Sequence, residues 1–207
     1  MLKHTNYFFN SVWDMKSKGL ILDMMRVFLE ACEAHQVNPI LMYGSLIGCM
    51  RNNHIIPWDG DVDFCVDNSL NYSNVKQYLI DKNLQVFLFH DGIKSYNYYM
   101  CMRICSKQGK KTLDNWSWPW IDVYFYEKNK KFVNFINCNK TIFYKANTED
   151  IFPLKKSIFE NFQVNTPASS VKILNDMYPN WSTVYESSKF DHRTTLKNKI
   201  IHRFEVR

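Results

Sequence analysis

YGSLIGCMRNNHIIPWDGDVDFCV, residues 43–66, is the stretch of this chain that says most about its fold. A Gly-Ser pair follows a short apolar segment, and carboxylates later occur at every second position. On a β-strand the side chains of residues i and i+2 point to the same face. We therefore expect a strand on which Asp61 and Asp63 project together while Val62 and Phe64 face the core.

Paired carboxylates on one strand face point to a metal site. Two such groups repel each other unless a cation lies between them, and their hard oxygen atoms suit Mg²⁺ or Mn²⁺. Burying Asp61 and Asp63 among apolar neighbours without a partner would be costly. Asp122 lies in the middle of a second apolar strand pattern, residues 120–126, and is the candidate for a third ligand. A purely structural Asp122 is the alternative.

The spacing of apolar residues along the chain favours an α+β fold. Helices are expected over residues 19–35, 45–52, 73–82 and 169–177, with a final basic helix over 196–204. Strands are expected over residues 40–43, 62–66, 84–89, 96–104 and 120–126, with a hairpin of residues 132–136 and 141–144. The helix at 45–52 would begin after a turn at Gly44-Ser45. Its free backbone N–H groups would favour phosphate, although an ordinary capped turn is also compatible.

The motif order resembles the LicD family, which includes fukutin and the fukutin-related protein. Members typically read Gly-[Ser/Thr]-Leu-Leu-Gly, then Arg, then Ile-Pro-Trp-Asp-x-Asp-[Ile/Val]-Asp. The matching stretches here are Tyr43 to Gly48, Arg51, and Ile56 to Asp63. Similar segments follow in the expected order, at residues 102–103, 121–123, 151–164 and 171–181. The resemblance covers roughly residues 20–185.

Three departures from the family pattern stand out. Gly60 occupies a position where many bacterial members carry another Asp, and Tyr124-Phe125 replaces a common Phe-Pro after the third Asp. Asn161 stands where Gly is usual after Phe-Glu. None of the three removes an expected metal ligand.

The resemblance implies a nucleotidyltransferase (polymerase-β-like) fold, a central mixed sheet flanked by helices. It also divides the chain into an N-terminal segment (1–18), a catalytic domain (19–186) and a basic C-terminal tail or helix (187–207). The implied activity is metal-dependent transfer of an alcohol phosphate from a CDP-linked donor, such as CDP-choline or CDP-ribitol, to a hydroxyl of a glycan acceptor, with release of CMP.

The resemblance also suggests roles for individual residues. Asp61 and Asp63 would hold Mg²⁺ (or Mn²⁺), Asp122 would ligate a second ion or accept the acceptor proton, and Asp59 would orient the site. Phosphate would be bound by the residues Gly44, Ser45, Arg51 and Arg103. Arginine offers two-pronged phosphate recognition, with surface ion pairs as the alternative role.

The tryptophans near these residues are open to two interpretations. Trp58 would stack on a base or sugar, or brace its turn. The alternating residues Trp116, Trp118 and Trp120 form a core stripe or an acceptor-sugar platform, with core favoured.

Two other functions use the same residues. One is a nucleotidyltransferase that attacks the α-phosphorus of a nucleoside triphosphate and releases pyrophosphate. The other is a glycan- or nucleotide-binding module without catalysis. Intact carboxylates argue against the second.

Composition narrows the class of protein. With 207 residues, 46% of them hydrophobic, the chain can form a sizeable core. Its net charge is +6, and the densest clusters of lysine, at 107–111 and 128–131, are explained by solvated loops, so no nucleic-acid partner is expected.

Neither a transmembrane segment nor a signal peptide is seen, which favours a cytoplasmic protein. The six cysteines read as buried reduced thiols rather than as a zinc site.

Overall fold

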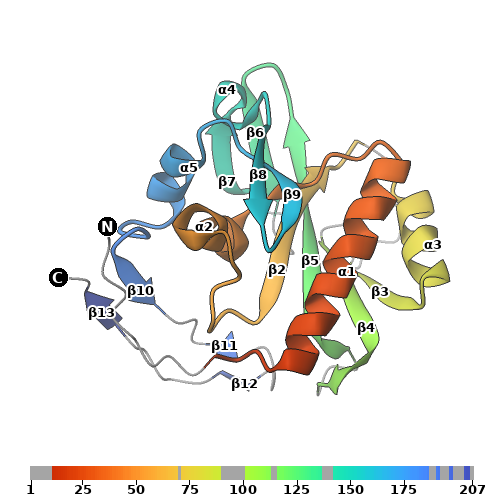
Figure 1. Cartoon of the computed structure of the whole chain (residues 1–207). Coiled ribbons are helices and arrows are strands. Elements are labelled where there is room, and N and C mark those ends of the chain that lie inside the picture. Colours follow the sequence, from red (N-terminus) through yellow and green to blue (C-terminus); the bar gives the residue numbers. More distant parts are fainter. Residues whose placement is uncertain are drawn as a thin grey trace.

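The computed structural model describes residues 11–69, 71–89, 101–112, 116–136, 142–186, 190–191, 196–197 and 203–205. Within these ranges the chain forms a nine-stranded mixed sheet flanked by helices (Figure 1). The strand order is β3-β4-β5-β2-β1-β9-β8, and β6 and β7 extend the sheet as a hairpin from β5. The predicted central mixed sheet with flanking helices is confirmed.

The elements have the following bounds. The helices are α1 Met15–Ala34, α2 Tyr43–Asn52, α3 Ser73–Asp81, α4 Thr148–Ile151 and α5 Ser170–Met177. The strands of the main sheet are β1 Ile40–Leu41, β2 Asp61–Asp67, β3 Leu84–Phe89, β4 Cys101–Lys111, β5 Ser117–Lys128, β6 Phe132–Ile136, β7 Ile142–Asn147, β8 Lys155–Phe159 and β9 Phe162–Thr166. Short strands follow at β10 Val184–Glu186, β11 Phe190–Asp191, β12 Leu196–Lys197 and β13 Arg203–Glu205.

The structure corrects three local expectations. Gly44 and Ser45 form no turn before a helix, because they lie in the first turn of α2 itself. The final helix over 196–204 is wrong where the structure describes that segment, since β12 and β13 are strands paired with β11 and β10. Residues 107–111 belong to β4 rather than to a loop. The β8–β9 hairpin was not anticipated.

Successive side chains of β2 point to opposite faces of the sheet, as the alternation of apolar and acidic residues predicted. Val62 and Phe64 are fully buried in a core shared with α1 and α3, as predicted. The ring of Phe64 packs against Phe28 of α1 with centroids 5.1 Å apart. The opposite face of β2 carries Asp61, Asp63 and Cys65, and Cys65 joins a second core together with residues of α2 and α5. A polar site is therefore enclosed between the sheet and these two helices.

Strand register brings charged residues to one level of this second face. Strands β2 and β5 run parallel with Asp63 opposite Asp122. Strands β4 and β5 run antiparallel with Arg103 opposite Asp122. Because neighbouring strands lie about 4.8 Å apart, the three side chains are held as close neighbours.

The β8–β9 hairpin closes with a two-residue turn whose residues, Glu160 and Asn161, both have positive φ (50° and 70°). Hairpin turns of this hand suit Gly and Asn, and a Glu there is strained. The Glu160 carboxylate compensates: it accepts hydrogen bonds from Lys18 Nζ (2.5 Å) and the Ile55 backbone N–H (2.7 Å). The turn thus fastens α1 to the segment that leads into β2.

None of the helices in the described ranges combines the length and apolarity needed to cross a membrane.

We predict that Glu160→Gln destabilises the fold by about 1–3 kcal/mol, because the replaced carboxylate leaves the Lys18 ammonium without its charged partner. Burial favours the protonated acid, but Lys18 and the Ile55 N–H outweigh it and hold the pKa of Glu160 below its ordinary value. The stabilisation is therefore present above the unfolded pKa and is lost as pH falls through the lower folded pKa. Urea denaturation at several pH values should show the gap between wild type and variant narrowing below pH 4.5.

Asn161 provides the matched control for this turn. Asn161→Gly should be tolerated, whereas Asn161→Ala should cost about 1 kcal/mol through its left-handed backbone. A Glu160→Gln protein as stable as wild type at neutral pH would refute the fastening role.

Candidate functional site

The three predicted metal ligands meet in one buried cluster. A carboxylate oxygen from each of Asp61, Asp63 and Asp122 lies within 4.8 Å of the others. Their exposed fractions are 6%, 8% and 2%. In the part of the chain that the structure describes, this is the one group of acidic, His or Cys side chains with such geometry. Three oxygens this close suit a hard divalent cation.

Asp59 adds a fourth carboxylate beside the cluster. Its backbone N–H donates to Ile56 O (3.0 Å), and its Oδ1 accepts from Gly60 N–H (3.1 Å). Burial and the neighbouring Asp61 raise the pKa of Asp59 well above its ordinary value. Burial and the charges of Asp61, Asp59 and Asp122 do the same to the pKa of Asp63, with Arg103 opposing them. Mutual repulsion in a poorly hydrated place is the common cause.

Arg103 is paired with one carboxylate of the cluster, that of Asp122. Its Nε and a terminal nitrogen donate to the two oxygens of Asp122 at 2.8 and 2.6 Å. The guanidinium also lies over the rings of Trp120 (4.0 Å) and Trp116 (4.7 Å). Such stacking fixes a planar guanidinium in place. In this structure Arg103 therefore positions Asp122, as the β4–β5 register places the two side by side, and its phosphate role stays a prediction.

The predicted phosphate-binding pair Gly44-Ser45 is also used inside the protein. Ser45 is buried, and its Oγ accepts a 2.9 Å hydrogen bond from the Asp63 backbone N–H. A Cβ on Gly44 would lie 2.2 Å from Asp59 Oδ2, so no side chain fits there. The positive end of α2 thus lies against the Asp59 carboxylate, where a helix dipole favours negative charge.

Arg51 and Trp58 both precede the acidic strand β2 in the sequence. Arg51 lies in the last turn of α2 and donates from Nε to the Trp181 carbonyl (3.0 Å), and a second N–H of its guanidinium reaches the same oxygen. This contact ties α2 to the chain that follows α5. Trp58 is half-buried immediately before Asp59.

Two of the alternating tryptophans, Trp118 and Trp120, are core residues, as favoured, and the half-buried Trp116 packs against them. Trp120 is fully buried, and Trp118 Nε1 donates to Gly60 O at 2.7 Å. The Trp118 ring packs on Trp13, with centroids 5.3 Å apart. Through this hydrogen bond, Trp118 holds the segment that leads into Asp61.

The cysteines agree with the expectation of buried thiols. The described cysteines are all buried and free of disulfides: Cys32, Cys49, Cys65, Cys101 and Cys105. Cys138 lies outside the described residues.

Sequence reasoning missed three tyrosines that surround Asp63. Tyr124 follows Asp122 by two positions on β5 and so shares its face, a signal that the sequence did contain. Tyr43 and Tyr178 come from α2 and the end of α5, and only the fold brings them there. Burial, together with the charge of Asp63, raises the pKa of all three hydroxyls. They remain protonated hydrogen-bond donors at neutral pH.

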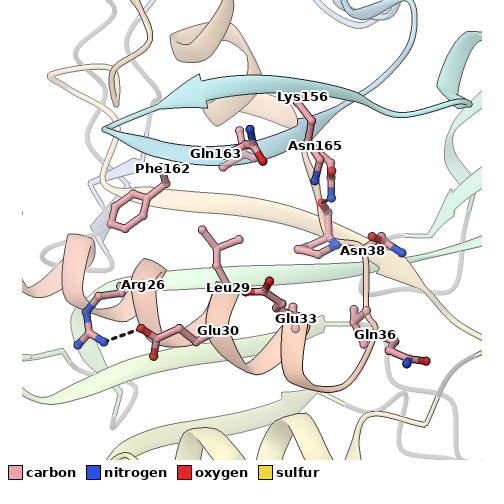
Figure 2. A pocket seen from close by; sticks show the side chains of 14 residues that line it. Arg26, Leu29, Glu30, Glu33, Gln36, Asn38, Lys156, Phe162, Gln163 and Asn165 are labelled. Atoms are coloured by element: carbon pink, nitrogen blue, oxygen red, sulfur yellow. Dashed lines mark hydrogen bonds and ion pairs between the residues drawn. The ribbon is translucent and has the colours of Figure 1, made fainter.

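A separate hollow of about 500 Å³ lies between α1 and the β8–β9 hairpin (Figure 2). Leu29 and Phe162 line it together with polar side chains such as Lys156 and Gln163, and Arg26 and Glu30 form an ion pair at one side. It contains none of the predicted site residues. The acidic cluster and this hollow are therefore different places on the molecule.

The chain is similar to a solved structure and to a curated protein of bacterial origin. The crystal structure of ANT(2")-Ia in complex with adenylyl-2"-tobramycin is 10% identical, covers 76% of this chain and 78% of its own, and superposes with a TM-score of 0.45. An uncharacterized protein of Rickettsia typhi is 26% identical over 163 residues, which is 75% of this chain. The chain spans 45% of the length of that relative.

A family model gives the decisive match. The model described as LicD/FKTN/FKRP, nucleotidyltransferase domain, matches residues 36–169, a stretch that contains all four aspartates of the site. That range is well over half of the 207-residue chain. By this match, the chain belongs to the LicD/FKTN/FKRP family.

Proposed function

We propose that this protein is a metal-dependent phosphotransferase that moves an alcohol phosphate from a CDP-linked donor to a hydroxyl of a glycan and releases CMP. Membership of the family indicates a transferase. The observation that carries the specific proposal is the buried cluster of Asp61, Asp63 and Asp122 on a mixed sheet. We assign the domain to the polymerase-β-like fold on the same grounds.

The cluster fits Mg²⁺ or Mn²⁺ because its ligand atoms are carboxylate oxygens, which hard divalent cations prefer. Four carboxylates gather there, and the Arg103 guanidinium offsets one of their negative charges. Burial and mutual repulsion raise the pKa of Asp59 and of Asp63, which is the environment that a bound cation would relieve. Asp61, Asp63 and Asp122 would hold the ion, which when bound supplies positive charge to the phosphate oxygens.

The residues divide the work of the transfer between them. The acceptor hydroxyl oxygen forms a bond to the distal phosphorus of the donor, and the bond from that phosphorus to the bridging oxygen breaks, so CMP leaves with the electron pair. The two hydrogen bonds from Arg103 orient Asp122 as a ligand. Asp59, which lies beside Asp61 and outside the assigned ligand set, is the group that would receive the acceptor proton.

A nucleotidyltransferase is the second candidate, favoured by the description of the matched family domain. It would use the same carboxylates but attack the α-phosphorus of a nucleoside triphosphate and release pyrophosphate. A donor screen separates the two functions. We expect Mg²⁺-dependent release of CMP from CDP-choline, CDP-ribitol or a related CDP-alcohol, with a glycan acceptor present. Pyrophosphate release from a nucleoside triphosphate, with every CDP-alcohol inert, would establish the alternative.

Asp61→Asn should reduce turnover by more than about a hundredfold, because it removes a charged ligand from the cluster. Mn²⁺ affinity, measured by titration, should fall with it, while the circular dichroism spectrum stays that of wild type. Asp23→Asn is the matched control, since Asp23 is exposed on α1, a helix that packs on the face of β2 opposite to the cluster. Full activity of Asp61→Asn would rule out the assigned ligand set.

Gly44→Ala should lower activity because its Cβ would displace the Asp59 carboxylate, which lies 2.2 Å from the Cβ position. Gly19→Ala is the control: Gly19 lies in α1 with nothing within 4 Å of a Cβ. That change should leave activity intact and stabilise the helix by about 0.5–1 kcal/mol. The comparison needs steady-state rates and thermal melts of both variants. If Gly44→Ala were as active as wild type, the position of the Asp59 carboxylate would not matter for the reaction.

A further inference from the structure

A row of aromatic rings leads from the protein surface to the acidic cluster. Phe143 on β7 is 56% exposed, and its ring lies 5.8 Å from that of Tyr43, centroid to centroid. The Tyr43 ring in turn lies 5.1 Å from that of Tyr124. We call these three residues the aromatic row.

The inner end of the aromatic row lies beside the carboxylates. Tyr124 is two positions after Asp122 on β5, and its partner on β2 is Cys65, two positions after Asp63. All four residues therefore share one face of the sheet. The charge of Asp63 is felt by the hydroxyls of both Tyr43 and Tyr124, in keeping with this placement.

The polarity of the aromatic row changes along its length. Its inner members, Tyr124 and Tyr43, carry hydroxyls next to the anionic cluster, whereas its outer member, Phe143, offers hydrocarbon alone. A nucleotide has the same order of parts: phosphate, then a ribose with hydroxyls, then a planar base. A glycan carries hydroxyls along its whole length and gains less from an apolar outer end. The order of groups therefore favours the nucleotide.

We propose that the aromatic row is the nucleoside subsite of this enzyme, with the base of the nucleotide stacked at Phe143 and its ribose beside Tyr43 and Tyr124. The inference rests on the proposed function, because the phosphate is anchored at the acidic cluster. It adds the position of the nucleoside relative to that cluster. Aromatic faces hold bases by stacking, which is sequence-tolerant and substantial in energy.

The test compares CMP with ribose 5-phosphate, which keeps the phosphate and sugar but lacks the base. Calorimetric titration in the presence of Mg²⁺ should show tighter binding of CMP to wild type. Phe143→Ala should weaken CMP binding about tenfold and leave ribose 5-phosphate affinity unchanged. Phe143→Tyr should restore CMP affinity, because it restores the ring face.

Ile142→Ala is the matched control. Ile142 is the neighbouring residue on β7, is 57% exposed, and is not a member of the aromatic row. It should bind both probes as wild type does. Unchanged CMP affinity in Phe143→Ala, or an equal loss for both probes, would overturn the subsite.

The outcomes also separate this inference from the proposed function. A protein that releases CMP from a CDP-alcohol, yet binds CMP no more tightly than ribose 5-phosphate, keeps the function and loses the subsite. A wild type that binds neither probe with Mg²⁺ present overturns both.

Discussion

Repulsion among buried carboxylates is the constraint on which the rest of this structure depends. Asp61, Asp63 and Asp122 gather on one sheet face with Asp59 beside them, where water screens their charges poorly. The fold meets this cost with the bidentate Arg103–Asp122 pair, packed under tryptophan rings. Repulsion is only partly relieved, as the raised pKa values show. That residual charge is the reason why we propose a divalent cation for the cluster.

The elements around the cluster hold it in shape without joining it. The Ser45 hydroxyl binds the Asp63 backbone, and Gly44 leaves room for the Asp59 carboxylate at the start of α2. Arg51 secures the other end of α2 to the Trp181 carbonyl. The Glu160 turn fastens the segment that enters β2. Several motif residues that resemble phosphate binders therefore serve first as supports for the aspartates, which must be held close against their own repulsion.

The fold and the ligands were predictable where local periodicity governs. The helix α1 follows from apolar spacing, and the opposite faces of Val62 and Asp63 follow from strand alternation. Asp122 was identified as a lone charge in an apolar strand, and the structure places it opposite Asp63. Arg103 was assigned to phosphate because sequence shows a guanidinium but not its partner. The final helix was wrong because amphipathic spacing in a short basic segment does not exclude strand pairing.

By itself, the sequence determined which residues are acidic, which strand faces they occupy and which family pattern they follow, because side-chain direction along a strand has a period of two. Only the tertiary structure decided what each of them contacts. The parallel register of β2 and β5 sets Asp63 beside Asp122, and the antiparallel register of β4 and β5 gives Arg103 to Asp122 rather than to a ligand. Packing of β7 against α2 places Phe143 next to Tyr43. These pairings join residues distant in sequence, and a local pattern carries no information about register between strands.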